Sequence, residues 1–108
     1  MMVDDATYGG YLARHERPPA FEGHDGRAYS VGVLVDEPAG ASARFGAAFV
    51  FVRWSEAGDQ PVGHVETPFL TFGDTAGEAE RGLHAMSLFD VKAQLDRAIA
   101  AREALGDW

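Results

Sequence analysis

The chain has 108 residues, of which 46% are hydrophobic, and its formal net charge is −8. This length suits one domain, and the hydrophobic content is enough to fill a single core. The nine lysines and arginines are dispersed, which argues against direct binding to nucleic acid, because phosphate backbones are bound by clustered basic residues. The absence of cysteine excludes disulfides, thiolate nucleophiles and cysteine-containing zinc or iron–sulfur sites.

The hydrophobic residues do not form a membrane span. The longest uninterrupted run of apolar or glycine residues extends from Phe45 to Val52, whereas a membrane helix needs about 20 such residues. The N-terminus also lacks the basic and then hydrophobic segments of a secretory signal. We therefore expect a cytoplasmic protein that contacts no membrane.

Residues 1–19 predict an N-terminal arm. Two aspartates before Tyr8 and Tyr11 could cap a short helix there, but a pair of glycines interrupts it. We expect this arm to pack only through its tyrosines. Residues 20–108 are then expected to form a single α+β domain.

The domain is predicted to begin with strands. Ala20 to Glu22 is followed by the turn sequence Gly23-His24-Asp25-Gly26, which is typical of a small hairpin. In the strand from Ala28 to Glu37, apolar residues occupy the odd positions, so these positions should face a core. The strand from Arg44 to Ser55 is apolar on both faces, which predicts a central strand covered on both sides or one that meets a partner.

A third strand is expected from Val62 to Phe72. Pro68 cannot donate a hydrogen bond to a neighbouring strand, so this strand should lie at an edge or break there. Thr75 and Glu78 form a capping box that begins a helix over Ala76 to Ala85.

Ser87 is a second helix start, and an apolar stripe then continues from Leu88 to Ala104, with Gly106 as the stop. The fold class is therefore α+β: an antiparallel three- to four-stranded meander followed by two C-terminal helices packed on one face.

The segment from Leu70 to Ala79 carries a resemblance to a known family. Its sequence, Leu-Thr-Phe-Gly-Asp-Thr-Ala-Gly-Glu-Ala, resembles the Thr-x-Gly-Asp-Thr-x-x-Glu-Ala segment of HicB-like antitoxin domains. This resemblance implies a three-stranded sheet followed by a helix, and a domain that binds and masks a small basic RNA-cleaving toxin. Two features depart from the family pattern: Glu66 to Phe69 replaces the proline- and glycine-rich turn, and no DNA-binding tail follows.

His64 and Glu66 are the strongest candidates for chemistry, because alternation along a strand puts both on one face. With His24, Asp25 or His84 nearby, they could bind a metal or transfer protons. The ligand spacing His-Glu-x-x-His is absent, which favours an ordinary solvated strand face. We expect no metal, no cofactor and no catalytic residue.

The remaining question is which face of the second long strand points outward. A charged Arg53 is least costly outside, on the side of His64 and Glu66, and that choice leaves Phe49 and Phe51 outside as well. The expected partner- or ligand-binding site therefore comprises Phe49, Phe51, Arg53, His64 and Glu66. The same choice turns other residues inward, and we expect a core of Tyr29, Val31, Val33, Val35, Val50, Val52, Trp54, Val65 and Phe69 against Leu83, Met86, Val91, Leu95 and Ile99.

The sequence thus predicts a small, acidic, non-enzymatic protein-interaction or regulatory module, which binds a protein partner or a second copy through its outer sheet face. The alternative is a small-molecule-binding protein or small enzyme that uses the same face around His64 and Glu66. A further alternative for the apolar patch is that Tyr8, Tyr11 and Phe21 fold over and fill it.

Overall fold

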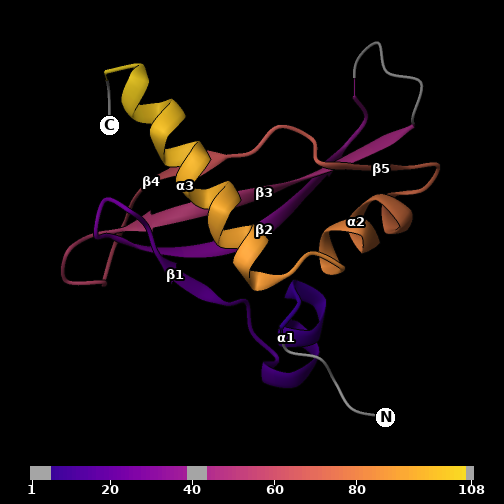
Figure 1. The fold of residues 1–108 in the computed structure, drawn as a ribbon, viewed down its shortest axis with the longest axis horizontal. Helices are drawn as coiled ribbons and strands as arrows, with labels where there is room; N and C mark the ends of the chain where they lie inside the picture. Colours follow the sequence, from indigo (N-terminus) through magenta and orange to yellow (C-terminus); the bar gives the residue numbers. More distant parts are fainter. Residues whose placement is uncertain (1–5, 39–43, 107–108) are drawn as a thin grey trace.

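Figure 1 shows the computed structural model, which describes residues 6–38 and 44–106: an antiparallel sheet with helices α2 and α3 on the same side of it. This confirms the predicted α+β class with helices after the sheet. The elements in chain order are α1 (Tyr8–His15), β1 (Ala20–Glu22), β2 (Ala28–Asp36), β3 (Phe45–Trp54), β4 (Pro61–Glu66), β5 (Thr71–Gly73), α2 (Ala76–His84) and α3 (Leu88–Ala104).

The sheet has five strands, one more than the sequence indicated. Strands β1 to β4 form a meander in chain order, and β5 also pairs with β3. One side of β3 is therefore shared by two strands that the sequence presented as one. They separate around Pro68, and the backbone hydrogen bonds to β3 are made on either side of it, from Thr67 N–H to Phe49 O (3.0 Å) and from Leu70 N–H to Ala47 O (2.8 Å).

Both C-terminal helices begin at the predicted residues. The Thr75 hydroxyl accepts a hydrogen bond from the Glu78 N–H at 3.1 Å, and the Ser87 hydroxyl accepts one from the Asp90 N–H at 3.0 Å. The Glu78 carboxylate reaches back to the backbone N–H of Asp74 at 3.2 Å, one residue earlier than a standard capping box requires.

Helix α1 forms in the N-terminal arm despite its two glycines. Thr7 caps it, while Asp4 and Asp5 lie outside the described residues. Tyr8 is buried, with its ring centroid 5.2 Å from that of Phe49, and Leu12 also packs against the core. The expectation that the arm packs only through tyrosines is therefore wrong. A side chain at Gly9 would come within 2.7 Å of the His84 Cβ, so the glycine that weakens the helix allows α1 to approach α2.

We call the sheet face that the helices cover the inner face and the opposite one the outer face. The core lies between the inner face and the helices. Odd-numbered residues of β2 and β3 point into it, as predicted for Tyr29 and Val31 but not for β3. The buried hydrophobic cluster consists of Tyr8, Tyr29, Val31, Ala47, Phe49, Phe51, Val65, Ala79, Leu83, Val91, Leu95, Ala98 and Ile99.

Candidate functional site

Phe49 and Phe51, which were expected on the outer face, are core residues with no exposed surface. That placement was wrong, and so was the expectation that Val50, Val52 and Trp54 point inward. The physical reason is area: two phenylalanines bury more apolar surface than two valines, so the phenylalanine face is the one turned toward the helices. Neither ring can contribute to a docking surface.

Strand alternation then carries Arg53 to the inner face together with Phe51. Its Nε lies 3.3 Å from Asp25 Oδ2, and the Arg53 and Asp25 side chains are only 16% and 10% exposed. The same carboxylate oxygen accepts a hydrogen bond from the Tyr29 hydroxyl at 2.7 Å, and Asp25 Oδ1 accepts one from the Arg27 N–H at 3.1 Å. Arg53 is thus part of a polar network beneath the β1–β2 turn, away from His64 and Glu66.

This network changes the acidity of its members. Burial by itself raises the pKa of the Asp25 carboxyl, but hydrogen bonds from Tyr29, Arg27 and Arg53 outweigh burial and hold that pKa below its ordinary value of 3.8. Burial, and then the hydrogen bond to Asp25, raise the pKa of the Tyr29 hydroxyl above its ordinary value of 10.0. Asp25 is therefore the charged partner that offsets the free-energy cost of burying the Arg53 side chain on the inner face.

His64 and Glu66 do lie together on the outer side of β4. The His64 Nε2 is 3.3 Å from the Glu66 Oε1, and the two side chains are 60% and 48% exposed. The other histidines proposed to join them are engaged elsewhere: His24 contacts Glu103, and His84 contacts Glu80. Among the described residues, no group of three or more histidine or acidic side chains is arranged to hold a metal ion.

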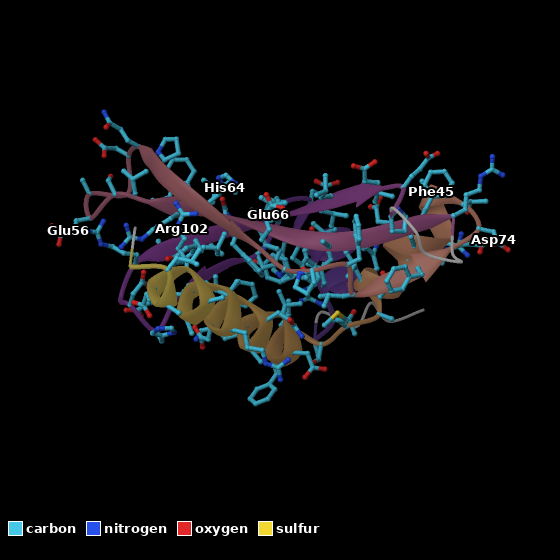
Figure 2. All side chains as sticks on the ribbon, turned by 90° about the horizontal axis from the view of Figure 1, so that it is seen from above. Phe45, Glu56, His64, Glu66, Asp74 and Arg102 are labelled. Atoms are coloured by element: carbon cyan, nitrogen blue, oxygen red, sulfur yellow. The ribbon has the colours of Figure 1, made fainter. Side chains whose placement is uncertain are left out.

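The outer face carries an apolar patch made of the β3 residues that were expected inside. Leu34 is 38% exposed, and Val50, Val52 and Trp54 are partly exposed. Registration places Val50 opposite Gly32 and Glu66, and Val52 opposite Ser30 and His64. We call Leu34, Val50, Val52 and Trp54 the outer patch. Figure 2 shows α3 beneath the sheet, and none of the described helices lies over the opposite face.

The predicted cover of the outer face by the N-terminal arm is not formed by Tyr8 or Phe21. Tyr8 packs on the inner side against Phe49, and Phe21 also packs against the core. The Trp54 indole N–H donates to the Ser30 hydroxyl at 3.1 Å, so the tryptophan is held by a side chain of the neighbouring strand β2. The outer patch is therefore bordered by side chains of the sheet itself.

A cleft lies beside the free edge of β4, where that strand faces α3. One part, of about 260 Å³, is lined by His64, Val65, Glu66, Ala98, Ala101, Arg102 and Leu105. A second part, of about 320 Å³, is lined by Glu66, Thr67, Pro68, Leu70, Gln94, Arg97, Ala98 and Ala101. Figure 2 shows Arg102 between α3 and β4, on the side of the molecule that carries His64.

Sequence reasoning found the strand wall of this cleft but missed its helix wall. The signal available was the pair of alanines at 98 and 101, one helical turn apart and flanked by arginines, which leaves little side-chain volume on that side of α3. No family model, curated protein or solved structure significantly matches the chain. No helix within residues 6–38 and 44–106 is long and apolar enough to cross a bilayer.

Proposed function

We propose that this chain is a non-catalytic protein-interaction module that docks through its outer patch, with a second copy of the chain as the first partner to test. The observation that carries the proposal is the exposure of apolar residues on the sheet face opposite the helices. Contiguous exposed apolar surface on a small protein usually marks an interaction site.

A second copy suits the patch because sheets can pack on each other and the patch carries no charge. Two sheets can stack face to face at about 10 Å, with side chains of each filling the space between them. All four residues of the outer patch are uncharged, so the negative charge of the chain, −8 in total, would not meet itself at the centre of such an interface. Repulsion between the remaining charges is screened by salt, so the dimer should become tighter as ionic strength rises.

The test is the oligomeric state of a patch variant. Val50→Ser with Val52→Ser should convert the dimer to a monomer in light scattering, with an unchanged circular dichroism spectrum. Phe89→Ser is the matched control, because Phe89 is 83% exposed on α3, away from the outer patch. If the unaltered chain is monomeric at about 100 µM, where a micromolar dimer would be formed, and pulls down no partner that the variant loses, the proposal fails.

The HicB-like resemblance names one specific second partner, a small basic ribonuclease. Three features support this candidate: the strand that precedes the cap, the capped start of α2 at Thr75, and the acidity of the chain. Co-expression with such a ribonuclease should protect the host from its toxicity and give a complex that co-purifies. A cytoplasmic location belongs to the same proposal, and cell fractionation would test it.

A further inference from the structure

We propose that the cleft beside β4 binds a peptide segment of another protein in extended conformation, as a strand added to the free edge of β4, and that this peptide carries acidic side chains. The inference goes beyond the outer patch: it concerns a different surface and can stand or fall independently of the proposed dimer. Four observations carry it, and they concern backbone groups, space, charge and the position of α3.

The first observation is the direction of the backbone groups of β4. The register that places Val50 opposite Glu66 continues to Phe49 and Thr67, where the Phe49 carbonyl accepts a hydrogen bond from the Thr67 N–H and the Phe49 N–H donates to the Thr67 hydroxyl at 3.0 Å. These two residues therefore occupy a hydrogen-bonded, closely spaced position of the antiparallel ladder. Closely and widely spaced pairs alternate, so Val65 also bonds to β3, whereas the N–H and C=O groups of His64 and Glu66 point away from it. Among the described residues no strand pairs with β4 on that other side.

The second observation is the space next to that edge. The two parts of the cleft share Glu66, Ala98 and Ala101, so they lie end to end along the strand and its continuation to Leu70. Residues advance about 3.3 Å along an extended chain, so the distance from His64 to Leu70 accommodates about six residues. An edge with outward backbone groups beside a groove is what added-strand recognition of a peptide needs.

The third observation is the distribution of side-chain chemistry in the cleft. Pro68, Leu70 and Ala101 give one part an apolar lining, while Arg97 and Arg102 stand on the helix wall. On the strand wall, the carboxylate of Glu66 is the single acidic side chain of the lining. Two arginines against one carboxylate leave the cleft with an excess of positive charge on a chain whose net charge is −8, and carboxylates are the groups that arginines recognise best.

The fourth observation is that the helix wall is held in place. Val91, Leu95 and Ile99 are fully buried in the core, and at the far side of α3 the Asp96 carboxylate accepts a hydrogen bond from the His24 N–H at 3.0 Å. A groove with rigid walls binds an extended segment with less loss of conformational freedom in the protein. Together these features specify a peptide with an apolar residue toward Leu70 and carboxylates toward Arg97 and Arg102.

The experiment is a selection from a library of random hexapeptides displayed on a neutral carrier, with the full chain as bait. Peptides that also bind the Ala101→Phe variant are removed by counter-selection. Ala101 is exposed and lines both parts of the cleft, so a phenylalanine at this position should fill the groove. Ala100→Phe is the matched control, since Ala100 is exposed at the preceding position of α3 and is not among the residues that line the cleft. We expect enriched peptides that combine apolar and acidic residues.

The best peptide should lose about tenfold or more in affinity with Ala101→Phe or when its acidic residues are replaced by lysine, and change by less than about twofold with Ala100→Phe. In amide NMR spectra of the unaltered chain, the resonances that shift when the peptide is added should centre on His64, Glu66 and Ala101. Enrichment of basic peptides, shifts centred on Val50 and Val52, or affinity that Ala101→Phe leaves unchanged would each overturn the proposal. So would a dimer in which a second copy occupies the same β4 edge.

Discussion

Strand β3 carries apolar side chains on both of its faces, and the two faces differ in what lies against them. On the inner face, Phe49 and Phe51 have no exposed surface and belong to one buried cluster with residues of α2 and α3. On the outer face, Val50 and Val52 remain partly exposed and are bordered by His64 and Glu66 of β4. Apolar residues at both odd and even positions thus show that a strand has two apolar faces. The relative sizes of the side chains then decide which of the two faces packs against the helices.

The largest expected effect comes from shortening one side chain to alanine on each face of β3. Phe51→Ala should lower the free energy of unfolding by about 3 to 5 kcal/mol, because it leaves a cavity in the core. Val52→Ala, at the adjacent position on the outer face, should cost about 1 kcal/mol or less, since its side chain is only partly removed from water. Urea denaturation of both variants measures the difference. A loss of about 2 kcal/mol or more for Val52→Ala, as for a buried aliphatic side chain, would mean that the outer face is covered in solution.

Much of the fold could be predicted because its signals are local. The Thr75 and Ser87 caps depend on residues three positions away, and the break at Pro68 depends on a missing N–H, so all three can be found in sequence. The glycines of α1 led to the wrong prediction of an interrupted helix, because their role depends on a contact with a distant part of the chain. Gly9 is required by the approach of His84, a residue 75 positions further along the chain, and no local pattern reveals that contact.

The candidate site was only half predictable, for a related reason. Alternation correctly paired His64 with Glu66, because two residues on one strand two positions apart share a face. Arg53 was placed outside on the general cost of burying a charge, but its partner is Asp25, in a turn that belongs to another hairpin. The position of β4 beside α3 likewise depends on tertiary packing, so the cleft between them has no signature in either segment alone.

Removing the charged partner of Arg53 is the second way to test the difference between the faces. Asp25→Asn should lower stability at neutral pH by roughly 1 to 3 kcal/mol, because it weakens hydrogen bonds to a largely buried carboxylate. Asp36→Asn, on the outer side of β2, is the control and should stay within about 0.5 kcal/mol. Chemical denaturation at pH 7 gives both values.

The same variant has a defined pH dependence. The pKa of Asp25 is lower in the folded chain than its ordinary value of 3.8, so the stabilisation it provides is present above that value and is lost as pH falls through the folded pKa. Asp25→Asn should therefore lose less stability than the unaltered chain when pH is lowered through that range. Parallel acid titrations of the two proteins would show no such divergence if the network did not form in solution.

The smallest effect expected concerns two glycines, one under the helices and one on the open face. A Cβ at Gly82 of α2 would lie 2.7 Å from the Thr71 Cβ on β5, which is too close for real atoms, whereas a Cβ at Gly32 of β2 would meet only the Val50 carbonyl oxygen at 3.9 Å. Alanine generally stabilises such positions by roughly 0.5 to 1 kcal/mol relative to glycine. Gly32→Ala should thus raise the melting temperature by a few degrees or leave it unchanged, and Gly82→Ala should lower it despite the better helix propensity of alanine. Differential scanning calorimetry decides the sign for each. A rise for Gly82→Ala would show that α2 sits further from the sheet than the structure places it, and a fall for Gly32→Ala would show that something packs against the outer face at that position.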